Sequence, residues 1–179
     1  YFVDKVVPML PFALSDDLCS LREDVPRLTM TCDIEMTPAG EPVRRDIYRS
    51  IIRSRRRCVY EELNALLEGD ESNAEKYREV MPVLREMMPL AEALNARRIA
   101  RGAMAFETIE PVVTLDEAGK PISVTARERG VTERLIEEFM LAANEAVAAH
   151  LTENKASCIY RIHEQPDPDR AGEVIATLH

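Results

Sequence analysis

Three acidic pairs are the first places in this 179-residue sequence where metal-dependent chemistry could occur. Hydrolysis of a phosphodiester by metal ions requires several carboxylates that converge on the same cations. The pairs are Asp16 with Asp17, Asp116 with Glu117, and Asp167 with Asp169. Each has a simpler interpretation, because the first follows a serine and suits a helix cap, the second suits a hairpin turn, and the third alternates with prolines. We therefore predict no metal site and no catalytic residue within the chain.

The histidines and cysteines do not form a nucleophilic or zinc-binding pattern either. The three histidines have no serine or cysteine motif around them, and the four cysteines include no CxxC pair. The sequence also has no signal peptide and no run of about 20 apolar residues that would span a membrane. Reduced thiols in a cytoplasmic protein without a membrane contact are therefore expected.

The charge is unevenly distributed along the chain. The net charge of −9 argues against a protein that coats nucleic acid non-specifically. Residues 44–57 nevertheless hold seven arginines and a single aspartate, and such a stretch could bind phosphates. The simpler interpretation is that Asp33 and Glu35 of the preceding segment pair with these arginines, or that water solvates them.

Two segments with alternating apolar and polar residues predict an antiparallel hairpin. The alternation from Arg27 to Thr37 is typical of a half-buried strand. Its apolar face comprises Leu28, Met30, Cys32, Ile34 and Met36. Pro38, Gly40 and Pro42 then favour a turn, and a second strand is expected over Val43–Ser54.

The rest of the chain combines helices with short strands. The expected elements are a helix over Val59–Leu67, a helical region over Asn73–Arg101 that Pro82 and Pro89 kink or break, short strands within Met104–Glu128, a helix over Thr132–Leu151 and a last strand over Cys158–His163. This order predicts an α+β fold, with a mixed, mainly antiparallel sheet and flanking helices.

A series of short motifs runs in order along almost the whole chain. They are Tyr1, VVPMLP (6–11), LSDDLCSL (14–21), DVPRLTM (24–30), CVYEELNALLEG (58–69), ARGAMAF (100–106), RLIEEFMLAANEAVAAH (134–150) and IYRIHEQP (159–166). The series resembles the catalytic RNB domain of the ribonuclease II and ribonuclease R family. An ordered series of this kind is more specific than any single motif.

The resemblance implies a 3′-to-5′ exoribonuclease that hydrolyses single-stranded RNA to 5′-mononucleotides with magnesium (Mg²⁺). In this family an Asp-rich magnesium-binding segment precedes the position of Tyr1, and a segment with catalytic arginines follows the position of His179. We therefore expect residues 1–179 to be the central part of one RNB domain, with the metal ligands outside this chain and no activity in the isolated fragment. The alternative is a catalytically silent RNB-like protein that only binds RNA or a protein partner.

The resemblance also implies four RNA-binding residues. Tyr1 and Phe106 match the two aromatics between which the family stacks RNA bases, and Tyr60 and Glu138 match polar positions that contact the ribose. Each has a structural alternative: Phe106 as a core residue of a strand, Tyr60 packed under the hairpin, and Glu138 facing solvent. The neighbouring Glu137 is expected to form a surface ion pair with Arg134.

Overall fold

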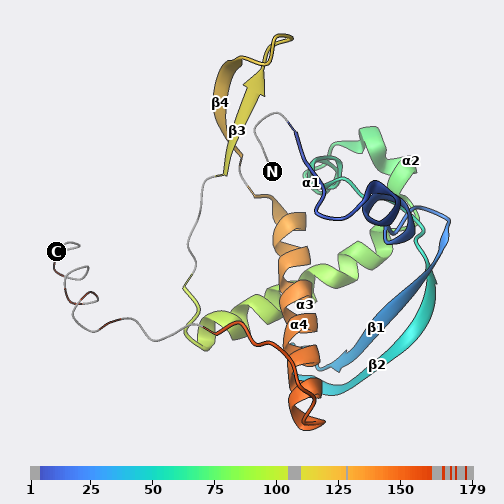
Figure 1. Cartoon of the computed structure of the whole chain (residues 1–179), viewed down its shortest axis with the longest axis vertical. Helices are drawn as coiled ribbons and strands as arrows, with labels where there is room; N and C mark the ends of the chain where they lie inside the picture. Colours follow the sequence, from blue (N-terminus) through green and yellow to red (C-terminus); the bar gives the residue numbers. More distant parts are fainter. Residues whose placement is uncertain are drawn as a thin grey trace. The chain divides into compact units, whose positions relative to one another are not determined.

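The computed structural model describes residues 5–104, 110–127 and 129–162, together with residues 167, 170, 172 and 176. The chain forms two compact units, Tyr1–Ala148 and Ala149–His179. Figure 1 shows the helices and strands coloured in chain order. Its labelled elements belong to the first unit, except for the last residues of helix α4 (Val131–Glu153).

Strands β1 (Pro26–Met36) and β2 (Pro42–Arg53) form the antiparallel hairpin that the alternation predicts (Figure 1). Gly40 in the connecting turn has a φ angle of +74°, which favours glycine. A Cβ at this position would also lie only 3.3 Å from the backbone nitrogen of Leu94 in helix α3 (Met81–Ala100). The turn therefore packs directly on α3, and glycine permits both the turn and the close approach.

The apolar face of β1 is not buried as expected. Leu28 and Met30 are 85% and 66% exposed, so the expectation of a half-buried apolar face is wrong for this half of the strand. The opposite face is partly covered, and there the hydroxyl groups of Thr29 and Thr31 lie 2.7 and 2.5 Å from the hydroxyl of Ser50. Alternation indicates which residues of a strand share a face. Whether that face is buried depends on which other elements pack against it.

The sequence predicts interruptions of the helical region Asn73–Arg101 at Pro82 and at Pro89, but the structure has a single break there. The helical elements are a short π-helix (Ala13–Leu18), α1 (Tyr60–Leu67), a 3₁₀ turn (Glu71–Asn73), α2 (Ala74–Tyr77), α3 and α4. Residues 78–80 separate α2 from α3, and Pro82 lies in the first turn of α3, where proline is tolerated. Helix α3 continues through Pro89.

The buried core lies where these helices meet. It consists of Leu63 from α1, Tyr77 from α2, Leu84 and Ala91 from α3, and Leu135 from α4. Burial of large apolar side chains contributes about 1.5–3 kcal/mol each relative to exposure. This cluster therefore fixes α1 and α4, which hold Tyr60 and Glu138, against α3.

The second hairpin consists of β3 (Glu110–Leu115) and β4 (Pro121–Arg127), which pair antiparallel. In the intervening turn, Asp116 Oδ1 accepts hydrogen bonds from the backbone N–H groups of Ala118 (2.9 Å) and Lys120 (2.8 Å). The interpretation of Asp116 and its neighbour as turn residues is therefore confirmed.

The fold combines helices with two separate two-stranded antiparallel sheets within the described residues, which confirms the α+β class. The strand expected over Cys158–His163 is wrong as far as the structure describes it, because residues 158–162 are irregular and Ile159 is fully exposed. A strand requires a hydrogen-bonded partner, and none pairs with this segment among the described residues. None of the described helices has the length and apolar character required to cross a membrane.

Candidate functional site

Two of the four predicted RNA-binding residues lie in the helical part of the structure. Tyr60 is the first residue of α1, and Glu138 lies within α4. Tyr1 and Phe106 lie outside the described residues. Their predicted stacking role therefore stays a prediction.

Glu138 is a buried carboxylate. The residue is only 6% exposed, so the alternative that it faces solvent is wrong. Its Oε1 atom accepts two hydrogen bonds from the Arg98 guanidinium, at 3.1 Å from Nε and 2.7 Å from Nη2. Arg98 Nη2 also donates to Asn95 Oδ1 at 3.1 Å. These three residues border a hollow of about 280 Å³ between α3 and α4.

Tyr60 borders a different hollow. It is 38% exposed and lines a hollow of about 430 Å³ together with Arg127 of β4, Arg129 and several residues of α4, among them Glu133. Glu137 borders both this hollow and the one at Glu138. The two predicted ribose-binding residues are therefore on helices joined by the core, but they do not line the same hollow.

Asn64 joins the helix of Tyr60 to the start of the helix of Glu138. Its Oδ1 accepts from the backbone N–H of Thr132 (3.0 Å) and from the Thr132 hydroxyl (2.8 Å). Its Nδ2 donates to Glu133 Oε2 at 2.8 Å. A Cβ at Gly130 would lie 2.0 Å from this nitrogen, so only glycine leaves room for the asparagine.

Glu133 is held as a carboxylate in this cluster. Desolvation by itself would raise its pKa, but hydrogen bonds from Asn64 and Thr132 and the charge of Arg127 hold the pKa below its ordinary value. Arg127 Nη2 lies 3.4 Å from Glu133 Oε1 and 3.0 Å from Glu61 Oε1. The arginine of β4 is thus paired with carboxylates from both α1 and α4.

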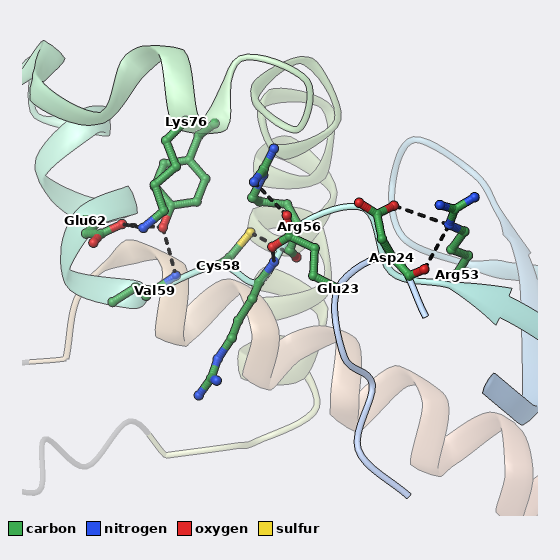
Figure 2. A network of polar contacts seen from close by, with 10 residues as sticks. Glu23, Asp24, Arg53, Arg56, Cys58, Val59, Glu62 and Lys76 are labelled. Carbon is green, nitrogen blue, oxygen red and sulfur yellow. Dashed lines mark hydrogen bonds and ion pairs between the residues drawn. The ribbon is translucent and has the colours of Figure 1, made fainter. Parts of the chain in front are cut away.

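A second cluster fixes the chain where it enters α1. Tyr77 is fully buried, and its hydroxyl accepts from the backbone N–H of Val59 at 3.3 Å and donates to Glu62. Lys76 also binds Glu62, as Figure 2 shows. Hydrogen bonds from Lys76 and Tyr77 lower the pKa of Glu62. Val59 directly precedes Tyr60, so this cluster helps to set the position of the tyrosine.

Two arginines of residues 44–57 pair with acidic residues that precede β1, and not with Asp33 or Glu35. Arg56 Nη1 donates to Glu23 Oε1 at 2.6 Å, and Arg53 Nε lies 3.3 Å from Asp24 Oδ1 (Figure 2). Asp33 instead accepts a hydrogen bond from the Tyr48 hydroxyl at 2.6 Å. The strand register explains this for Arg45, Arg49 and Arg53, because Asp33 shares a face with Tyr48, opposite to the face that holds these three arginines.

Two further expectations concern ion pairs and metals. Glu137 forms an ion pair with Arg129. The prediction that its partner is Arg134 is therefore wrong. Among the described residues, no group of three or more His, Cys, Asp or Glu side chains could hold a metal ion. These residues therefore do not fit a magnesium site, and no catalytic step through a metal follows from them.

Comparison with known families decides the identity of the domain. The model of the RNB domain matches residues 1–179, the whole of the chain. The chain belongs to the RNB family. This outcome confirms the resemblance that the ordered motifs indicate.

Curated relatives of this RNB domain are ribonucleases R. Ribonuclease R 1 of Lactococcus lactis is 43% identical over 170 residues, which cover 95% of this chain and 21% of the relative. Ribonuclease R of Thermotoga maritima is also 43% identical over 170 residues, with 94% of this chain and 24% of the relative covered. The chain thus spans less than a quarter of the length of either relative.

A solved structure has the same fold as this RNB domain. Mycoplasma genitalium RNase R, in complex with ribose-methylated single-stranded RNA, matches with a TM-score of 0.90 and 32% sequence identity. The match covers 97% of this chain and 27% of that protein. The arrangement of α1, α3 and α4 around the candidate site is therefore shared with that RNase R.

Proposed function

We propose that the full-length protein is a cytoplasmic exoribonuclease that removes nucleotides from the 3′ end of single-stranded RNA and releases 5′-mononucleotides. This chain is the central part of its RNB domain and contributes RNA-holding residues. The match of the RNB domain to all 179 residues is the observation on which the proposal rests. The ribonuclease R relatives and the RNA-bound structure support the same substrate class.

Tyr60 and Glu138 are proposed to recognise the ribose. The 2′-hydroxyl is what distinguishes RNA from DNA at a single nucleotide, and it can both donate and accept a hydrogen bond. A carboxylate such as Glu138 accepts from that hydroxyl, and the phenol of Tyr60 can accept or donate. The burial of Glu138 supports this role, because a hydrogen bond shielded from water discriminates better than one at an exposed site.

Tyr1 and Phe106 are proposed to stack the bases. Stacking of a base on an aromatic side chain contributes about 1–3 kcal/mol and tolerates every base, which suits an enzyme that degrades RNA of any sequence. Magnesium dependence is part of the same proposal, with ligands from outside this chain. The described residues supply no metal-binding group of their own.

The experiment uses the full-length protein and one single-stranded RNA oligonucleotide labelled at either end. With magnesium, the 3′ label should appear at once as a mononucleotide, while the 5′ label should remain on chains that shorten progressively. Chelation by EDTA should stop both changes, and the matched DNA should be cut far more slowly. Internal cleavage would contradict the proposal. Binding without cleavage would instead favour the catalytically silent RNB-like protein.

A further inference from the structure

We propose that Arg98 is a positioning residue that presents one oxygen of Glu138 to the ribose 2′-hydroxyl. This inference rests on the proposed role of Glu138 in RNA recognition. Arg98 is contributed by α3 and Glu138 by α4, 40 positions later in the sequence. The pair borders the hollow of about 280 Å³ between these helices.

The hydrogen bonds of the pair are asymmetric. Both donors of Arg98, Nε and Nη2, bind the same oxygen, Oε1 of Glu138. No hydrogen bond from a described residue reaches the second oxygen, Oε2. Every fully buried side-chain oxygen among the described residues has a hydrogen-bond partner. Oε2 has none, so it is not fully buried. One carboxylate oxygen is thus engaged by Arg98, and the other has no hydrogen-bond partner among the described residues, in a pair that borders the hollow.

The arginine is itself held in place. Its Nη2 donates to Asn95 Oδ1 from the preceding turn of α3, at 3.1 Å, and its side chain is largely covered. A guanidinium is planar and presents its N–H donors in a fixed arrangement. A carboxylate bound by this group keeps one orientation before the substrate arrives, so less freedom is lost on binding.

The alternative is that the ion pair of Arg98 and Glu138 only holds α3 against α4 and has no role in RNA recognition. Arg101, the residue directly after α3, and Glu145 of α4 provide a comparison, because they connect the end of α3 to α4 through two hydrogen bonds of 3.2 and 2.9 Å. Their side chains are more than half exposed, and neither borders the hollow at Glu138. A role in helix pairing alone predicts a loss of stability that is larger for Arg98, whose partner is buried, and no change in ribose recognition for either arginine. A role in positioning predicts a change in ribose recognition for Arg98 only.

The test measures binding of the full-length protein to RNA oligonucleotides in EDTA, so that no cleavage is required. Each oligonucleotide carries a single 2′-deoxy nucleotide at one of the positions near the 3′ end, and the readout is the ratio of the dissociation constants of the deoxy-substituted RNA and the unmodified RNA. Variants are Arg98→Gln, Arg98→Lys, Glu138→Ala and the control Arg101→Gln. Thermal unfolding of each variant reports whether the helices still pack.

At the position that Glu138 contacts, Arg98→Gln should lower the ratio about three- to tenfold, within the range by which hydrogen-bonded neighbours couple. Arg98→Lys should keep part of the ratio, because it retains the charge without the planar pair of donors. Arg101→Gln should leave the ratio unchanged. If Glu138→Ala lowers the ratio and both Arg98 variants keep it, or if the Arg98 variants weaken binding to both RNAs equally, the positioning role is refuted.

Failure of the proposed function would give results that differ from those of a failure of the Arg98 inference alone. If Glu138→Ala leaves the ratio unchanged at every position, Glu138 does not recognise the ribose, and the inference on Arg98 is refuted together with that role. If the unaltered protein discriminates but does not cleave RNA with magnesium, the exoribonuclease assignment is refuted, while the ratios of the Arg98 variants still decide the inference.

Discussion

Asn64→Ala should loosen the junction between α1 and α4, because one side chain makes three hydrogen bonds there. Asn64 binds the backbone and hydroxyl of Thr132 and the carboxylate of Glu133. Thr132 is only 1% exposed, so its backbone N–H depends on the Asn64 side chain for an acceptor in the folded protein. The Thr132 hydroxyl retains weaker partners at Tyr60 O (3.5 Å) and Glu133 Oε2 (3.4 Å).

These contacts set the size of the effect. A buried donor left without a partner costs about 1–3 kcal/mol, and the hydrogen bond to Glu133 contributes about another 1 kcal/mol. The opening free energy of this junction should therefore fall by about 2–4 kcal/mol. Since 1.4 kcal/mol corresponds to a factor of ten, the protection of backbone amides at the junction should fall roughly 30- to 1,000-fold.

Hydrogen exchange of the full-length protein, followed by mass spectrometry of peptides from α1 and the first turns of α4, measures this loss. Asn73→Ala is the matched control, because Asn73 makes no capping hydrogen bond at the start of α2. The control should leave protection within a few-fold of the unaltered protein. Equal protection in Asn64→Ala and Asn73→Ala would refute the conclusion that Asn64 joins the two helices.

Three further outcomes are expected. Phe106→Ala in the full-length protein should weaken single-stranded RNA binding by about 1–3 kcal/mol and change the size of the final RNA fragment; global unfolding in circular dichroism would favour a core role. The isolated 179-residue chain should release no mononucleotides from labelled RNA with magnesium, and release that survives removal of contaminating nucleases would contradict this expectation. Because Lys76 and Tyr77 lower the pKa of Glu62, its contribution to stability should be complete above the ordinary value of 4.5 and be lost as the pH falls below it. Hydrogen exchange of α1 should show this loss, and Glu62→Gln should remove that part of the acid dependence.

Local pattern predicts the strands and helices of this chain well. Alternation and the turn at Gly40 place both strands of the first hairpin within one or two residues of their bounds, because pairing of adjacent strands depends on nearby residues. Alternation cannot say whether another element covers the apolar face, and Leu28 and Met30 are exposed. Cys158–Ile162 has the composition of a strand but no described partner, so composition alone is misleading there.

The candidate site depends on contacts between residues far apart in sequence. The ordered motifs indicate the family and the positions Tyr60 and Glu138. They do not indicate that Arg98 binds Glu138 or that Asn64 binds Thr132, 68 positions away, because these pairs meet only after the helices pack. The tight fit of Gly130 against Asn64 also has no signal in a single sequence.

The most direct test of the ribose-recognition role compares cleavage of matched RNA and DNA oligonucleotides by the full-length protein with Tyr60→Phe, Glu138→Ala and the double variant. Tyr160→Phe and Glu145→Ala are controls for loss of a phenol or a carboxylate outside the two hollows. An unpaired buried polar group costs about 1–3 kcal/mol, so Glu138→Ala and the double variant should lower the preference for RNA by roughly five- to a hundredfold. Tyr60→Phe should lower it less, because Tyr60 is 38% exposed, and the controls should keep it. An RNA preference that is unchanged in all three site variants would contradict the assignment of Tyr60 and Glu138 as the residues that recognise the ribose.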